Sequence, residues 1–457
     1  MRERRGLAYG ALAASFAFAV TVLLFPWPAQ ALLQAARGHN YVGVASCAGS
    51  TCHGRSEADG KIVRQDELRA WQDPSSPAGA HSRAWRVLTE PRSKAIAARL
   101  GIGEASTAPA CLGCHATPAG GARGPRFQIS DGVGCESCHG PASGWLASHY
   151  AVGGTHSNNV ARGMVPLDDP RARAGQCLDC HFGSADAGQF VNHRIMAAGH
   201  PRISFELDLF STLQQHHNED GDYVQRKRRT NPVQMWAVGQ AMALERSLTL
   251  FQNVERGTEG MFPEFYFFDC HTCHRRISDD PRAEPDKEAN PARPIPRGMP
   301  AYNDENMIML SAAARVVAPA AASRFDRDSR AFHLAIAKDR ASALAAANPL
   351  KASARAVADA FAGGVSRAQT FEIIDAIAGG AISPRFTDYA GSVQAVMAVD
   401  TLLSSLVNSG QVSGSAAEAI RADINGAYRA VREPNDYRPR DFRASLGRAA
   451  SAIRKLK

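Results

Sequence analysis

Ten consecutive residues, Gly132-Val133-Gly134-Cys135-Glu136-Ser137-Cys138-His139-Gly140-Pro141, carry the strongest structural signal in this chain. Two cysteines separated by two residues and followed directly by histidine form the attachment signature of a c-type haem. The sulfurs bond to the haem vinyl groups, and the histidine is placed to be the proximal ligand of the iron. The signature predicts that covalent cofactors, more than an apolar core, organise this part of the chain.

The signature occurs five times and uses all ten cysteines. The attachment pairs are Cys47/Cys52, Cys111/Cys114, Cys135/Cys138, Cys177/Cys180 and Cys270/Cys273, and the histidines that follow them are His53, His115, His139, His181 and His274. Four motifs have two residues between the cysteines, whereas the first has four. Zinc also binds cysteine pairs, but it does not need histidine directly after every second cysteine. We therefore predict five covalently attached haem c groups, with no cysteine left for a disulfide or a nucleophile.

The formal charge of +8 does not indicate a nucleic-acid partner. Two of these charges belong to the first five residues, which we expect to be removed. A ferric haem with two nitrogen ligands and two propionates carries about −1, so five haems offset most of the remainder.

The first 31 residues predict an export signal. Arg2, Arg4 and Arg5 precede an apolar run from Leu7 to Phe25, and Ala29-Gln30-Ala31 is a small-x-small cleavage site. The run is also long enough to span a bilayer, so an uncleaved membrane anchor is the alternative. Export predicts a periplasmic location.

Two domains are expected beyond the signal. Residues 32–300 hold every haem motif and a Pro-rich end, with helices over Ala84–Leu100 and Asn231–Glu255. Residues 301–457 contain no cysteine and many alanines, and their apolar spacing predicts a bundle of five or six helices of unknown role. Ser366 with Gln369 and Ser415 with Glu418 fit capping boxes, and Asp441 could cap the last helix. The predicted fold is mainly α with extensive loops: a multihaem domain and a C-terminal helical bundle.

The five irons need sixth ligands, and nine of the ten remaining histidines lie within residues 32–300. The stretch Asn192 to Pro201 supplies His193 and His200, with Met196 as a thioether alternative. Of the adjacent pair His216 and His217, one is expected to face an iron, and we take His217.

A family resemblance emerges from Tyr41-Val42-Gly43, Ala70-Trp71 and Ala80-His81-Ser82-Arg83-Ala84, together with the stretch from Gly132 to Pro141 and His149 beyond it. Residues 41–200 resemble the cytochrome c554 family of multihaem cytochromes. The resemblance implies that His81 and His149 are distal ligands of haems other than those nearest in sequence, that haems stack in pairs, and that the haem at Cys111/Cys114 could lack a sixth ligand. The four-residue first loop, the fifth haem and the helical C-terminus depart from the family pattern.

The sequence favours a periplasmic electron-transfer protein whose haems are mostly ligated by two histidines. The alternative is a multihaem oxidoreductase that acts on a small nitrogen or sulfur compound at one open haem. Redox proteins are the expected partners, nucleic acid is not, a membrane is contacted only through an N-terminal anchor, and self-association stays open. No separate catalytic constellation is found, so electron transfer is preferred over catalysis.

Overall fold

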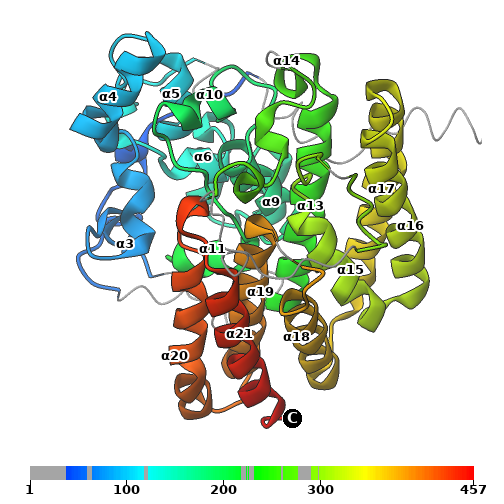
Figure 1. Cartoon of the computed structure of the whole chain (residues 1–457). Coiled ribbons are helices and arrows are strands. Elements are labelled where there is room, and N and C mark those ends of the chain that lie inside the picture. Colours follow the sequence, from blue (N-terminus) through cyan, green and yellow to red (C-terminus); the bar gives the residue numbers. More distant parts are fainter. Residues whose placement is uncertain are drawn as a thin grey trace, which may run out of the picture. The chain divides into compact units, whose positions relative to one another are not determined.

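The computed structural model describes residues 38–58, 64–117, 122–217, 223, 225, 231–258, 261–275, 290–296, 298–386 and 388–457. These residues form helices and loops and no strand (Figure 1). Isolated β-bridges join Tyr41 to Arg123 and Phe268 to Tyr302. The predicted mainly helical fold is confirmed. The predicted export segment and most of the Pro-rich stretch lie outside the described residues.

The chain forms two compact units. Unit 1 comprises Met1–Cys47, Ala119–Gln128 and Cys135–Leu167, and unit 2 comprises Ala48–Pro118, Ile129–Gly134 and Asp168–Lys457. The elements of unit 1 are short: η1 (Val44–Ser46), α6 (Cys135–His139), η5 (Ala142–Gly144), α7 (Leu146–Tyr150) and α8 (His156–Ala161). Its small core contains Ala142, Trp145 and Met164. A core of this size gives unit 1 little apolar burial of its own.

The part of unit 2 that carries attachment motifs is built from short helices joined by loops. They are α3 (Glu67–Gln72), η2 (Pro77–Arg83), η3 (Arg86–Thr89), α4 (Pro91–Leu100), α5 (Pro109–His115), η4 (Ile129–Asp131), α9 (Pro170–His181), α10 (His193–Ala197), α11 (Leu207–Leu213), α13 (Pro232–Gln252), α14 (Val254–Gly257), η6 (Phe265–Phe267) and η7 (Cys270–Thr272). Proline begins η2, α4, α5, α9 and α13. Proline suits a first helical position, where its missing N–H would have no helical partner. Many prolines in this region therefore start helices.

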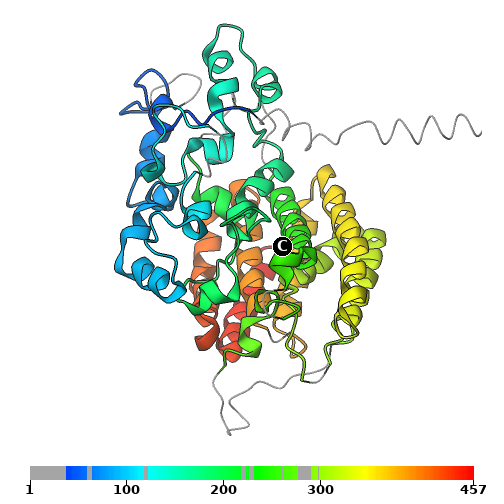
Figure 2. The ribbon, with the colours of Figure 1, turned by 90° about the horizontal axis from the view of Figure 1, so that it is seen from above.

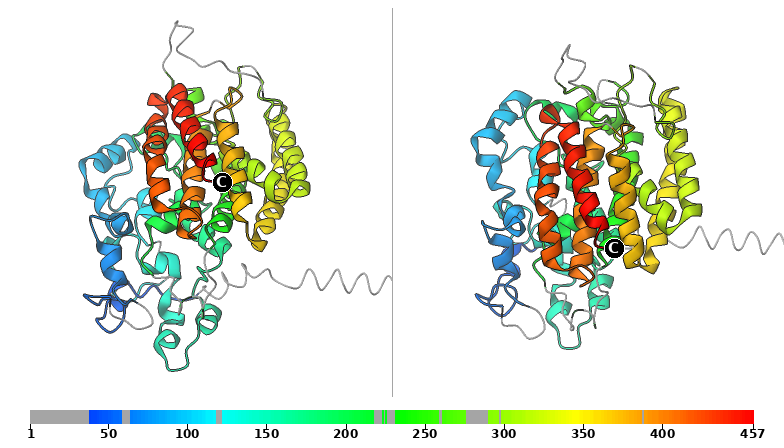
Figure 3. Two further views of the ribbon diagram at one scale, coloured as in Figure 1. Left: turned by 90° about the horizontal axis from the view of Figure 1, so that it is seen from below. Right: turned by 60° about the horizontal axis from the view of Figure 1, so that its bottom comes forward.

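Seven further α-helices follow among the described residues beyond 301. They are α15 (Glu305–Val317), α16 (Pro319–Ile336), α17 (Arg340–Ala360), α18 (Arg367–Ala381), α19 (Tyr389–Asn408), α20 (Gly414–Ala430) and α21 (Pro439–Arg454), with η8 (Phe361–Gly363) and η9 (Pro434–Asp436) between them. The pairs α16/α17 and α20/α21 pack side by side in both views of Figure 3. The predicted bundle exists, with more helices than the five or six expected.

One hydrophobic core runs through unit 2 across residue 300. It joins Trp236, Leu248 and Phe251 of α13 to α15, α17 and α18, and to most of α19. Figure 2 shows α13 beside the yellow helix α17. In the described part of the chain, α19 is the one helix long and apolar enough to cross a membrane, but 83% of its apolar window is buried in the protein. It is the central helix of this core.

Several predicted helix ends differ from the structure. The helix expected over Ala84–Leu100 is divided into η3 and α4 because Pro91 starts a new helix. The helix expected over Asn231–Glu255 ends at Gln252, since the side chain of Asn253 caps α14. The capping box of Ser366 and Gln369 is confirmed.

Two predicted caps in the C-terminal bundle are wrong. Ser413, not Ser415, accepts the N–H of Ala416 at the start of α20. Asp441 lies in the first turn of α21, which starts at Pro439, and is not its cap. An acidic side chain in a first turn is still favourable, because it faces the positive end of the helix dipole.

Candidate haem sites

Four of the five attachment motifs lie on helical turns. Cys111 to His115 end α5, Cys135 to His139 form α6, Cys177 to His181 end α9, and Cys270 begins η7. Helical positions three apart share a face, so each turn presents its two sulfurs on one side with the histidine next to them. The first motif, with its longer spacing, follows η1 in a turn.

The attachment cysteines differ in how far the protein covers them. None of the ten forms a disulfide. Eight of them are half-buried, but Cys52 and Cys273 are exposed. The first and fifth motifs therefore each have their second cysteine at the protein surface. A haem attached there would not be enclosed by protein on all sides.

The exposure of Cys273 has a local cause. It directly follows η7, a single turn that ends at Thr272, and its N–H donates to the carbonyl of Cys270 at 3.2 Å. Cys270 packs against the hydrophobic core of unit 2, whereas Cys273 and His274 after it are exposed. A haem at this pair stays a prediction, and it would have one thioether bond against the core and the other at the surface.

Three of the histidines that follow attachment cysteines in unit 2 lie close to a second histidine, at similar distances between ring centres. The ring centres are 6.4 Å apart for His81 and His181, 6.2 Å for His115 and His200, and 6.2 Å for His193 and His274. Two imidazole nitrogens bound to one metal at about 2.0–2.1 Å place their ring centres roughly 6.3 Å apart. The three pairs therefore fit two axial ligands of one iron each.

Hydrogen bonds at Nδ1 leave Nε2 available in one of these pairs. His115 Nδ1 lies 2.8 Å from the carbonyl of Ala84, and His200 Nδ1 lies 2.8 Å from that of Pro201. A carbonyl only accepts, so each Nδ1 carries its proton and each Nε2 has a free lone pair, as a metal ligand requires. Burial lowers the pKa of His200, which favours the neutral ring. Gly199 permits this turn because its φ is 115°.

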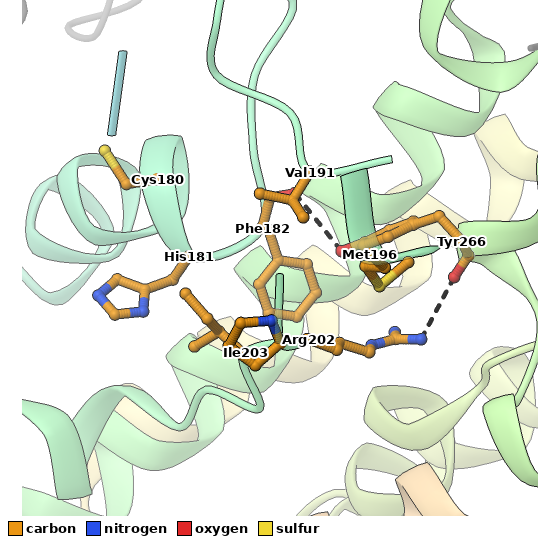
Figure 4. A pocket seen from close by; sticks show the side chains of 9 residues that line it. Cys180, His181, Phe182, Val191, Met196, Arg202, Ile203 and Tyr266 are labelled. Carbon is orange, nitrogen blue, oxygen red and sulfur yellow. Dashed lines mark hydrogen bonds between the residues drawn. The ribbon is translucent and has the colours of Figure 1, made fainter. Parts of the chain in front are cut away.

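His181 lies beside a small cavity, and Figure 4 shows the side chains that line it. The lining consists of Cys180, His181, Phe182, Val191, Met196, Pro201, Arg202, Ile203 and Tyr266. Phe205 stacks on the His181 ring at 4.7 Å, and no described residue bonds its buried Nδ1. Burial, followed by the charge of His81, lowers the pKa of His181 to about 4. A neutral imidazole next to an attachment sulfur has the chemistry of a haem ligand.

The second and fourth motifs adjoin within unit 2. Cys114 Sγ lies 3.8 Å from the carbonyl of Gly188, and Cys180 Sγ lies 3.8 Å from that of Gly113. The approach requires glycine, because a Cβ at Gly113 would meet Gly188 O at 2.4 Å. In unit 1, the Cys135 thiol is hydrogen-bonded to Cys47, the first residue of the first motif. The second motif thus contacts the fourth, and the third motif contacts Cys47 of the first.

The fifth motif borders a group of buried charges. Arg202 Nη1 lies 3.7 Å from Cys270 Sγ, and Asp269 accepts the backbone N–H of Ala390 at 2.9 Å. Burial, followed by the charge of Asp388, raises the pKa of Asp269 to about 7. The nearby His333 is buried 3.0 Å from Asp304 in the helical region, which is a structural role.

The first proximal histidine has a carboxylate partner. His53 Nδ1 lies 3.0 Å from Glu67 Oε2, and His217 Nδ1 lies 3.6 Å from Glu67 Oε1. Burial alone would raise the pKa of Glu67, but hydrogen bonds from His217 and His53 outweigh it and lower that pKa well below its usual range. The neighbouring His216 points its Nδ1 at Gln214 O, 2.8 Å away, and both rings are half-buried. That contact orients His216 as a ligand at least as well as His217.

Unit 1 contains a side chain whose role the sequence did not reveal. Glu136, between the cysteines of the third motif, accepts the backbone N–H groups of Val42, Gly43 and Ala142 at 2.9, 2.8 and 2.7 Å. In the sequence, only the presence of an acidic residue between two attachment cysteines could have indicated this role.

His149, a predicted distal ligand, also lies in unit 1. It packs on Trp145 with the ring centres 5.7 Å apart, and Asn159 Nδ2 lies 3.5 Å from its Nδ1. These contacts orient the ring, and its role as a ligand stays a prediction.

Comparison with known proteins gives one match. Residues 46–140 match the family model described as cytochrome c554 and c-prime. That region contains the first, second and third attachment motifs in full, from Cys47 to His139. No curated protein and no solved structure matches the chain.

Proposed function

Because residues 46–140 form a cytochrome c554 and c-prime family domain of a multihaem c-type cytochrome, we propose an electron-transfer role for this chain. We propose that it is a periplasmic electron carrier with five covalently bound haems. The family implies c-type haem and export from the cytoplasm. The five attachment motifs support the haem number, and the export signal predicted in residues 1–31 supports the periplasm.

The three histidine pairs 6.2–6.4 Å apart are the observation that carries this proposal. Haem iron held by two imidazoles exchanges electrons at a site that is closed to substrate. His81, His200 and His193 are proposed as the distal partners of His181, His115 and His274. His149 and one of His216 and His217 remain candidates for the other two irons.

A route for electrons is proposed within unit 2. The second and fourth motifs adjoin through Gly113 and Gly188. The cavity next to His181 is lined on its other side by Arg202, which also contacts Cys270 of the fifth motif. The order second, fourth, fifth follows from these contacts. The exposure of Cys273 supports the fifth haem as an end of the route, where a redox protein would exchange electrons.

Catalysis at an open haem receives less support from this geometry. The resemblance raised that alternative for the haem at Cys111/Cys114, but His200 faces His115 at the distance of a second axial ligand. We therefore propose a closed site there.

Mass spectrometry and EPR test the proposal. Five attachments should add about 3.1 kDa to the processed chain, roughly 0.62 kDa each. His81→Ala, His193→Ala and His200→Ala should each convert one low-spin haem to a high-spin one, whereas His156→Ala, on α8, should not. A mass short of five haems, or unchanged low-spin spectra in all three variants, would contradict the proposal.

A further inference from the structure

The end of the first attachment motif is hydrogen-bonded to the segment that leads into α3. We call these two segments, residues 51–55 and 64–68, the clasp; both lie in unit 2. Its contacts are Arg55 N to Gln65 O at 2.7 Å, Leu68 N to His53 O at 3.0 Å, Gln65 Nε2 to Thr51 O at 3.2 Å, and His53 Nδ1 to Glu67 Oε2 at 3.0 Å. These bonds fix the end of the attachment loop that has four residues between its cysteines.

The backbone of the clasp is held in an unfavourable conformation. Gln65 has φ 62°, and it is the only non-glycine residue with positive φ in the described part of the chain. Such a conformation is strained and persists where surrounding contacts impose it. Here both backbone groups of Gln65 are used, since its N–H donates to Glu67 Oε1 at 3.3 Å and its carbonyl accepts from Arg55. The turn directs Glu67 at His53.

The charge of Glu67 determines which nitrogen of His53 is available. Glu67 is buried, with 5% of its surface exposed, and its carboxylate oxygens lie 3.0 Å from His53 Nδ1 and 3.6 Å from His217 Nδ1. An ionised carboxylate only accepts hydrogen bonds, so His53 Nδ1 carries the proton. Its Nε2 lone pair is then directed away from the carboxylate and is the ligand atom.

The Nδ1 groups of His115 and His181 have weaker acceptors than that of His53. His115 Nδ1 donates to the neutral carbonyl of Ala84, and no described residue bonds the buried Nδ1 of His181. A negative acceptor makes an imidazole more basic, and a more basic ligand stabilises the ferric state. The Nδ1 groups of the three histidines therefore differ in their acceptors. His53 has a charged carboxylate, His115 has a neutral carbonyl, and His181 has no acceptor among the described residues.

We propose that Glu67 positions His53 as an axial ligand and sets the first haem at a lower reduction potential than the haems of the second and fourth motifs. The inference rests on the proposed function, because it requires a haem at Cys47/Cys52. It makes the first haem the one that holds an electron least strongly among these three.

Spectroelectrochemical titration of the holoprotein tests the role of Glu67. Glu67→Gln keeps an acceptor for His53 but removes the charge, so one midpoint potential should move upward while the others stay. Glu67→Asp keeps the charge on a shorter side chain and should move the same midpoint less. Glu104→Gln, an exposed acid of unit 2, removes one negative charge away from any described histidine contact and is the matched control.

The outcomes separate the two proposals. If Glu67→Gln carries five haems by mass and shifts no midpoint beyond the Glu104→Gln control, the role of Glu67 is refuted and the electron-transfer proposal stands. If the wild-type chain lacks the haem at Cys47/Cys52, the five-haem proposal fails first. Should Glu67→Gln lose that haem, the wild-type titration still decides, since a first haem whose potential is not the lowest of the three would overturn the inference.

Discussion

Glu136 has three backbone N–H groups as its partners, and they come from both sides of the third attachment motif. Hydrogen bonds to a charged group contribute about 1.5–3 kcal/mol each, and buried donors left without an acceptor add a cost. Glu136→Ala should therefore lower the free energy of unfolding by at least about 4 kcal/mol.

Denaturant unfolding followed by the fluorescence of Trp145 and the haem absorbance measures this loss. Ser157→Ala, an exposed position of α8 in the same unit, is the control and should stay within about 0.5 kcal/mol of wild type. Equal stability of the Glu136 and Ser157 variants would show that the carboxylate does not hold this loop.

The angles between paired imidazoles predict distinct EPR signals. The rings of His115 and His200 meet at 87°, and those of His193 and His274 at 41°. Crossed ring planes leave two iron d orbitals close in energy, which makes a ferric low-spin signal highly anisotropic. We expect the most anisotropic signal to disappear in His200→Ala and to remain in His193→Ala; the reverse pattern would contradict the ring assignment.

Proximal and distal histidines differ in how far sequence alone can identify them. His181 directly follows Cys180, so a local motif identifies it. His81 lies 6.4 Å from it but is a hundred positions away in the chain. That proximity depends on how η2 and α9 pack, which spacing does not encode. His193 and His200 were predicted as candidates without their partners for the same reason.

At the scale of elements, helix starts were predictable where one side chain decides them. Ser366 and Gln369 form the expected capping box, whereas Ser413 replaces Ser415 as the cap of α20. Both serines precede a suitable apolar pattern, and only backbone geometry distinguishes them. Pro91 divides the helix expected over Ala84–Leu100 because it occupies the first position of α4.

The correction at α20 can be measured directly. Ser413→Ala removes the acceptor for the N–H of Ala416 and should cost about 1 kcal/mol of stability. Ser415→Ala removes no cap and should be nearly neutral, because alanine is the best helix former. Thermal unfolding of the two variants decides between the positions, and a larger loss in Ser415→Ala would restore Ser415 as the cap.

At the scale of the whole molecule, the hydrophobic core of unit 2 joins segments from both sides of residue 300. Val233, Trp236 and Phe251 of α13 pack in one cluster with α15, α18 and α19. Buried amides add to it: Asn306 donates to Gln240 at 2.7 Å, and Gln240 donates to Gln394 at 3.0 Å. The change in composition at 301 suggested separate domains, but composition does not report which surfaces pack together.

Truncation at residue 300 should therefore expose the apolar face of α13. We expect a chain ending there to be insoluble, or to lose the haem of the fifth motif, because Asp269 also loses its contact with Ala390. Solubility and haem mass of the truncated and full chains measure this. A soluble fragment with all five haems would show that the haem region does not need residues 301–457 to fold.

Asp269 also predicts how stability changes with pH. Its pKa is raised to about 7 in the folded protein, so between about pH 4 and pH 7 the folded state binds more protons than the unfolded state. Stability should fall as pH rises through this window, by at most about 1.4 kcal/mol per pH unit from this group. Asp269→Asn keeps an acceptor for Ala390 and should flatten the slope, and an unchanged slope in denaturant titrations would contradict the assignment.

The core that spans residue 300 has a consequence for assembly order. Every attachment motif is complete at His274, whereas α15, α17 and α19, which pack on α13 together with the earlier α9 and α11, begin only at Glu305 and beyond. A chain delivered amino end first presents all ten cysteines before the residues that close the core have arrived. Haem attachment could thus take place on an open polypeptide, before the last third of the chain completes the hydrophobic core of unit 2.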